Sequence, residues 1–184
     1  MIAVGDRGYI VLSDDNGRTW RRAKSPAAPL LTAVEFLDAT SGWAVGHDSV
    51  ILATADGGET WAQQFAAPAE QRPLLDVLFV NRDTGFAIGA YGAFYETGDG
   101  GRSWNPRKVI EDDKHLNAFV RLSEGRLVIL GEAGTILLSA DADVRSGQVF
   151  RDGTIPYQRF RGGEIAGRTA GLVGLGAVGR ALRW

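Results

Sequence analysis

The sequence predicts an all-β protein over most of its length, and three observations support this prediction. Short apolar segments alternate with turns that are rich in glycine, aspartate and asparagine, which is typical of strands joined by tight turns. One eight-residue segment occurs three times without gaps, ending at Trp20, Trp61 and Trp104. The three tryptophans are 41 and 43 residues apart, and a near-fixed period in this range indicates blades or solenoid repeats.

The repeated segment, called the box below, has the pattern Ser/Thr-x-Asp-x-Gly-x-Thr/Ser-Trp. Its glycine suits the positive φ of a tight hairpin, and its aspartate can accept hydrogen bonds from the N–H groups of the turn. The hydroxyls can do the same at the strand ends, and the tryptophan opens the next strand and is expected to bury its ring between neighbouring sheets. Structural roles rather than catalysis or metal binding are therefore predicted for Ser13, Asp15, Gly17, Thr19, Trp20, Thr54, Asp56, Gly58, Thr60, Trp61, Thr97, Asp99, Gly101, Ser103 and Trp104.

The similarity between repeats extends upstream of each box. A glycine stands eight residues before the first Ser/Thr, at Gly5, Gly46 and Gly89, and follows a short apolar strand. A second strand lies between this glycine and the box, and a further strand comes earlier, at 31–36 and 75–79. Each unit therefore predicts a four-stranded antiparallel blade.

A fourth unit begins at 130–141 but lacks the glycine and the tryptophan of its box. The sequence thus predicts an incomplete β-propeller of about three and a half blades over residues 1–141, whereas propellers usually close with four to eight blades. An open arc would expose sheet edges and apolar blade faces. A partner, a second copy that self-associates through the open edges, and a chain that is a fragment are the three explanations left open.

Composition excludes several classes of function. The net charge is -2, with 20 basic and 22 acidic residues, so no nucleic-acid partner is expected. Without cysteine there is no disulfide and no Cys-ligated zinc, and His47 and His115 lie in different repeats, where both are expected in surface loops. No metal site is therefore predicted. Neither an apolar stretch of ~20 residues nor a signal peptide is visible, which leaves the compartment open.

The boxes resemble the Asp-box (BNR) repeat of sialidase-like propellers. With the upstream pattern from Phe36 to Gly46 and from Phe79 to Gly89, residues 1–141 look most like the photosystem II assembly and stability factor family. This resemblance implies a non-catalytic, protein-binding assembly module with a protein partner and no cofactor. The arginine triad of sialidases has no place in the sequence. The charged loops 21–24, 70–72 and 111–114 are candidate contacts, and the alternative is that they are solvated surface.

The tail, residues 142–184, has a different character. A short apolar strand leads into the G-x-G-x-x-G turn of Gly174, Gly176 and Gly179, with a helix expected from about Ala177, which is the context of dinucleotide binding. The tail resembles the start of the NAD-binding domain of D-isomer-specific 2-hydroxyacid dehydrogenases. The ribose-binding acid and the catalytic residues of that family are absent, so NAD is expected only under the alternative of a dehydrogenase fragment fused to the repeats, too short for turnover. The two resemblances meet near 140–143, which predicts a chimera or a fusion.

Overall fold

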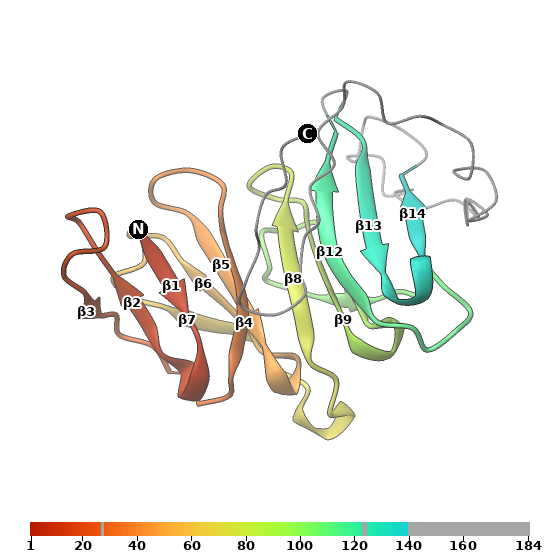
Figure 1. Cartoon of the computed structure of the whole chain (residues 1–184), viewed down its shortest axis with the longest axis horizontal. Helices are drawn as coiled ribbons and strands as arrows, with labels where there is room; N and C mark the ends of the chain where they lie inside the picture. Colours follow the sequence, from red (N-terminus) through yellow and green to blue (C-terminus); the bar gives the residue numbers. More distant parts are fainter. Residues whose placement is uncertain (27, 123–124, 140–184) are drawn as a thin grey trace, which may run out of the picture.

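The structure, a computed structural model, describes residues 1–26, 28–122 and 125–139. Its strands form four antiparallel sheets that follow one another in sequence order, from the red sheet at one side of Figure 1 to the cyan sheet at the other. Within each sheet, strands that are consecutive in sequence are neighbours, so each sheet is one blade. The first and fourth blades have three described strands and the middle two have four, which confirms the predicted incomplete propeller.

The strands of the four blades have the following bounds. The first blade contains β1 (Ile2–Val4), β2 (Ile10–Leu12) and β3 (Arg21–Arg22). The second blade contains β4 (Leu31–Phe36), β5 (Gly42–Gly46), β6 (Ile51–Thr54) and β7 (Ala62–Phe65). The third blade contains β8 (Leu74–Phe79), β9 (Gly85–Gly89), β10 (Phe94–Thr97) and β11 (Asn105–Pro106). The fourth blade contains β12 (Leu116–Arg121), β13 (Leu127–Gly131) and β14 (Ile136–Leu138).

One prediction about the charged loops is wrong. Arg21 and Arg22 were expected in a loop, but they form the short strand β3, which pairs with Leu12 and Val11 of β2. The reason is the box itself, because its hairpin returns the backbone along β2 directly after the tryptophan. Two exposed arginines at the blade edge are compatible with a strand, since an edge strand faces solvent.

A single turn of 3₁₀ helix recurs in every blade, directly after the repeated glycine and its counterpart Gly131. Its middle residue has a positive φ of between 53° and 59° in all four copies. The four copies are η1 (Asp6–Gly8), η2 (His47–Ser49), η4 (Ala90–Gly92) and η5 (Glu132–Gly134). A fifth 3₁₀ turn, η3 (Pro68–Glu70), lies in the connection between the second and third blades.

Two kinds of repeated glycine are required by close contacts within a blade. Gly42 pairs with Phe36 across β5 and β4, and a Cβ atom there would lie 2.7 Å from the phenyl ring. A Cβ atom on Gly46 would lie 2.1 Å from the carbonyl oxygen of Leu30, where the strand pairing is irregular. Gly85 and Gly89 repeat these two contacts in the third blade. The spacings seen in the sequence therefore record steric requirements of the blade.

The hydrophobic core of the described residues consists of three clusters, each shared by two neighbouring blades. The first joins Ile10 and Leu12 of the first blade to Leu52 of the second. The second joins the second and third blades, and there Trp43 stacks on Phe79 with ring centroids 3.5 Å apart. The third cluster joins the third and fourth blades. Each blade is thus held by the faces of its neighbours.

Among the first strands of the second, third and fourth blades, β8 contacts both β4 and β12 (Figure 1). Side chains bridge them where no ladder of backbone hydrogen bonds connects separate sheets. Glu35 Oε2 accepts a hydrogen bond from Phe79 N at 2.7 Å, and Asp76 Oδ2 accepts one from Phe119 N at 2.7 Å. Arg121 donates to the carbonyl oxygen of Phe79 at 2.8 Å. Two half-buried carboxylates and one arginine therefore fix the spacing of three blades.

Candidate functional site

The box aspartates are directed into their own turns. In the second box, Asp56 Oδ1 accepts hydrogen bonds from Thr60 N at 2.9 Å and Thr54 Oγ1 at 2.8 Å. Its other oxygen, Oδ2, accepts the hydroxyl of Thr60 at 2.5 Å. Asp15 and Asp99 have the same arrangement with Thr19 and Ser103. Both oxygens of each carboxylate are therefore occupied by groups of the same hairpin.

These hydrogen bonds keep the three box carboxylates ionised. The pKa values of Asp15, Asp56 and Asp99 are lowered to about 2, chiefly by the hydrogen bond from the hydroxyl of Thr19, Thr60 or Ser103. A carboxylate that stays ionised cannot donate a proton near neutral pH, so it is unsuited to general-acid catalysis. Among the described residues, no group of three or more potential metal ligands is present.

The remaining box positions complete the hairpin. The first hydroxyls of the three boxes, on Ser13, Thr54 and Thr97, are buried and accept hydrogen bonds from the box glycine N–H groups at 2.7–3.0 Å. The box glycines have φ values of 83°, 94° and 85°, and the residues just before them are also left-handed. Two consecutive left-handed residues match the twist of a tight hairpin. The box residues are Ser13, Asp15, Gly17, Thr19, Trp20, Thr54, Asp56, Gly58, Thr60, Trp61, Thr97, Asp99, Gly101, Ser103 and Trp104.

The box tryptophans do not all behave as expected. Trp61 and Trp104 are buried, with 5% and 7% of their surface exposed, and each packs in a cluster with the preceding blade. Trp20 is 44% exposed, so the prediction of burial is wrong for this residue. The physical reason is that each ring packs against the blade before it, and no described blade precedes the first.

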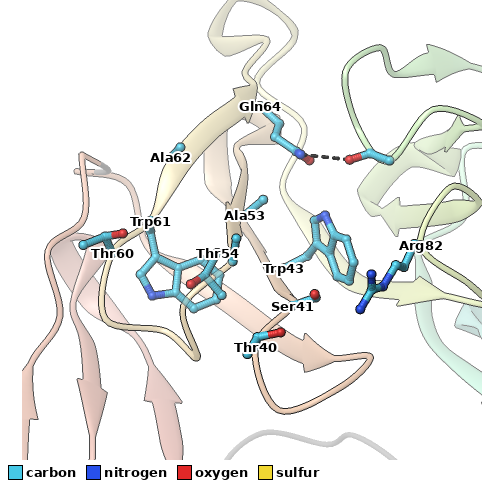
Figure 2. Close-up of a pocket in the computed structure, with 12 residues that line it drawn as sticks. Thr40, Ser41, Trp43, Ala53, Thr54, Thr60, Trp61, Ala62, Gln64 and Arg82 are labelled. Carbon is cyan, nitrogen blue, oxygen red and sulfur yellow. Dashed lines mark hydrogen bonds between the residues drawn. The ribbon is translucent and has the colours of Figure 1, made fainter.

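A cavity of about 670 Å³ lies between the second and third blades, beside the boxes (Figure 2). Strands β5, β6 and β7 form one side, and Arg82 and the third box contribute the other. The exposed Thr60 and Arg82 stand at its rim, so the cavity is open to solvent. It is lined by Thr40, Ser41, Trp43, Ala53, Thr54, Ala55, Thr60, Trp61, Ala62, Gln64, Arg82 and Gly100.

Two buried polar atoms of this lining have no hydrogen-bond partner within the described part of the protein. They are the donor Trp43 Nε1 and the acceptor Gln64 Oε1. The other end of the same amide is fixed, because Gln64 Nε2 donates to the carbonyl oxygen of Gly100 at 3.0 Å (Figure 2). Figure 2 also shows that the nitrogen of the Trp43 indole lies on the side of the ring that faces the Gln64 amide.

The rim hydroxyls, in contrast, are already engaged. Thr40 donates its hydroxyl to Asp38 at 2.8 Å, and Thr60 donates its own to Asp56. The guanidinium of Arg82 forms an ion pair with Asp38 at 3.3 Å. These polar groups at the rim are therefore engaged within the protein.

The charged loops make interactions within the protein. Arg21 forms ion pairs with Glu59 and Asp14, Tyr95 donates to Glu70 at 2.7 Å, and Lys114 pairs with Asp112 at 2.9 Å. All of these ion pairs lie at exposed or half-exposed surface, where such pairs contribute little to stability.

The two histidines belong to different blades, His47 to the second and His115 to the start of the fourth. His47 is exposed, whereas His115 is half-buried and makes an edge-on contact with Tyr91 at 5.1 Å between ring centroids. The predicted dinucleotide turn, Gly174, Gly176 and Gly179, lies outside the described residues, as does the whole segment 142–184. In the described ranges no helix is long and apolar enough to cross a membrane.

The sequence pattern did not reveal the cavity, because neither of its unpaired polar groups belongs to the repeat. A signal was nevertheless present. Counting back from the repeated glycine, the counterparts of Trp43 in the other blades are apolar residues without a hydrogen-bonding side chain, namely Ile2, Phe86 and Val128. A position where one repeat departs from the others in polarity is therefore the feature that would have marked this site.

Comparison with known proteins identifies the repeat family. The family model described as photosynthesis system II assembly factor YCF48 matches residues 12–72 and 63–159. The second match continues past residue 141, where the predicted repeat region ends. A search of the curated proteins gave no match.

Two solved structures share the fold. "YCF48 bound to D1 peptide" aligns with a TM-score of 0.50 and 19% identity, over 78% of this chain and 62% of that chain. YCF48 from Cyanidioschyzon merolae aligns with a TM-score of 0.57 and 19% identity, over 74% of this chain and 48% of that chain. This chain thus spans between about half and three fifths of their length. Since the family model covers most of the sequence, the chain belongs to the photosynthesis system II assembly factor YCF48 family.

Proposed function

We propose that this chain is a non-catalytic, protein-binding module of an assembly factor, and that it binds an extended segment of a protein partner. Membership of the YCF48 family is the observation that carries the proposal. The solved complex of a family member with a D1 peptide supports a peptide of that kind as the ligand.

The box geometry supports a binding role over a catalytic one. The three box carboxylates, Asp15, Asp56 and Asp99, accept hydrogen bonds from groups of their own hairpins. The charged loops are likewise engaged within the protein, as in the pairing of Lys114 with Asp112. A cavity between the second and third blades, lined by Trp43, Trp61 and Gln64 among others, is open to solvent beside these boxes.

The proposal is tested by titrating a fluorescently labelled D1 peptide with the full chain and measuring anisotropy. We expect saturable binding, and weaker binding of a scrambled peptide of the same composition and charge. Both peptides are measured at two salt concentrations, because an interaction that depends only on charge weakens as salt rises. Equal affinity for the two peptides, or no binding of either, would reject the proposed function.

A further inference from the structure

Each blade has two faces, because successive side chains of a strand point to opposite sides of its sheet. The face that packs on the following blade, called the leading face below, is formed in the second blade by Trp43, Val45 and Ile51. The face that packs on the preceding blade, called the trailing face, is formed in the second blade by Ala44, Val50, Leu52 and Trp61. A leading face meets a trailing face three times within the chain, once in each core cluster.

The trailing face of the first blade has no described blade against it (Figure 1). Counting from the repeated glycine, its residues are Ala3, Tyr9, Val11 and Trp20. Tyr9 and Trp20 are 45% and 44% exposed, whereas their counterparts Val50 and Trp61 in the second blade are 1% and 5% exposed. The first blade therefore presents to solvent the same apolar positions that the second blade buries.

The leading face of the fourth blade is the other unmatched face. Its residues Val128, Leu130 and Ile136 are the counterparts of Trp43, Val45 and Ile51, and all three are apolar and half-buried. None of the three core clusters of the described residues includes them. The alternating residues Ile129 and Leu137 are buried in the cluster with the third blade, so this face is directed away from that blade.

The two unmatched faces are complementary, because each repeats a face that already fits the other kind inside the chain. A leading face of an Asp-box blade is the surface that covers a trailing face at all three junctions. A trailing face packed on another trailing face occurs at none of them. Apolar surface with exposed aromatic side chains is typical of protein–protein contacts. A second copy of this chain supplies the matching face for both ends.

We propose that the trailing face of the first blade binds the leading face of the fourth blade in a second copy of the chain. The contact is head-to-tail, since it joins two different surfaces. Two copies bring together eight described blades, four from each, and propellers close with four to eight blades. The pair therefore closes into a ring with two identical contacts. The inference goes beyond the proposed function and does not depend on it.

Sedimentation of the full chain over a range of concentrations tests the association. We expect the mass to rise from that of one copy to that of two. Tyr9→Glu on the trailing face and Ile136→Glu on the leading face should each weaken association at least about tenfold, because each buries a charge in the contact. Tyr91→Glu makes the same change at a 52% exposed tyrosine outside both faces and should leave association unchanged.

Mixing the two variants tests the head-to-tail arrangement. Tyr9→Glu keeps its leading face and Ile136→Glu keeps its trailing face, so one intact contact can form between them. With a fluorescent label on one variant only, we expect a mixed pair that is weaker than the unmodified pair and stronger than either variant alone. The urea midpoint shows that each variant is folded, and Trp20→Glu and Val128→Glu replace a variant that is not.

Three results would overturn the inference. The first is the mass of one copy at every concentration, and the second is association that both folded variants leave unchanged. The third is association that is lost in Tyr9→Glu and kept in Ile136→Glu, with no gain on mixing, because a trailing face bound to itself would give this result. None of these results bears on the binding of the D1 peptide, so the proposed function is judged separately.

Discussion

At the scale of single residues, some positions of the repeat pattern have room only for glycine. Gly46 approaches the carbonyl oxygen of Leu30 so closely that a Cβ atom would lie 2.1 Å from it. Its φ of -172° is ordinary extended backbone, so the requirement is steric rather than conformational. Gly98, in contrast, has nothing within 4 Å of the place where a Cβ atom would stand.

The first prediction compares these two glycines. Gly46→Ala is expected to lower the free energy of unfolding by about 2 kcal/mol or more, because the obstacle is backbone and cannot move aside. Gly98→Ala is expected to change it by less than about 0.5 kcal/mol. Urea unfolding followed by tryptophan fluorescence measures both. Equal loss in the two variants would mean that the close approach at Gly46 is not a real constraint.

The box aspartates give a prediction about acid stability. Hydrogen bonds lower the pKa of Asp56 to about 2 from its ordinary value of 3.8. A carboxylate with a lowered pKa contributes stability that is complete above the unfolded-state pKa and is lost as the pH falls toward the folded-state pKa. The contribution of the box aspartates to the urea midpoint is therefore expected to be constant above about pH 5 and to fall between about pH 4 and 2.

Asp56→Asn tests this account. The variant should be less stable at pH 7, because an amide nitrogen cannot accept the Thr60 hydroxyl, and it should lose less stability between about pH 4 and 2. Asp83→Asn removes the same charge at an exposed position outside the boxes and should keep the acid dependence of the unmodified protein. If Asp56→Asn kept that dependence too, the lowered pKa would not be linked to folding.

At the scale of elements, the inner strands β4, β8 and β12 are joined by half-buried charges rather than by a backbone ladder. Burial raises the pKa of Glu35 to about 7; the hydrogen bond from Phe79 N and the charge of Arg121 oppose this, and the charge of Asp76 adds to it. Burial also raises the pKa of Asp76. The link between the second and third blades therefore involves a carboxyl group that changes its charge near neutral pH.

The sign of the resulting pH dependence is opposite to that of the boxes. The unfolded protein loses the Glu35 proton near pH 4.5 and the folded protein near pH 7, so stability is full below about pH 4.5 and decreases as the pH rises to 7. Solvent screens this partly exposed carboxyl group, so we expect Glu35 to lower the free energy of unfolding by about 2 kcal/mol over this pH range. Glu35→Gln keeps an oxygen acceptor for Phe79 N and should remove the pH dependence of stability that comes from Glu35. The control variant Glu111→Gln, at an exposed position, should keep that pH dependence. Urea unfolding at about pH 5 and about pH 8 decides between them, and an unchanged pH dependence in Glu35→Gln would refute the assignment.

At the scale of the whole molecule, each core cluster is shared by two adjacent blades, so stability should depend on nearest neighbours. Phe79 is central to the cluster between the second and third blades, where Trp43 stacks on it and Trp104 meets it edge-on. Phe94 is buried in the cluster between the third and fourth blades. The two phenylalanines therefore report on different interfaces.

Phe79→Ala is expected to lower the free energy of unfolding by about 3–5 kcal/mol, which is the usual cost of replacing a buried aromatic side chain by alanine in proteins. Hydrogen exchange should then lose protection mainly in β5, β6, β9 and β10. Phe94→Ala should reduce protection in the third and fourth blades and leave β2 unchanged. A uniform loss in all blades for both variants would show that the molecule unfolds as one unit without local coupling.

The repeat by itself determined the blades, because its glycines, box aspartates and apolar strands act within one blade, over at most about 16 positions, as from Leu30 to Gly46. The spacing of Gly42 from Phe36, and the requirement for glycine at position 46 opposite Leu30, follow from contacts inside one blade. Hydrogen bonds such as that from Thr60 to Asp56 span only four residues. Because each blade needs the same local interactions, the same residue types recur at the same spacing in each repeat.

The exposed ring of Trp20, the bridge from Glu35 to Phe79 and the cavity at Trp43 and Gln64 were decided only by the tertiary structure. The bridge and the cavity depend on which face of one blade meets the next, and their contacting residues are distant in sequence, as Gln64 and Gly100 are 36 positions apart. The box tryptophan is buried where a described blade packs against it, as at Trp61 and Trp104, and exposed at Trp20, where none of the described blades does. Packing between blades, unlike the turn within a blade, has no fixed spacing in the sequence, and this is why the candidate binding site became visible only in three dimensions.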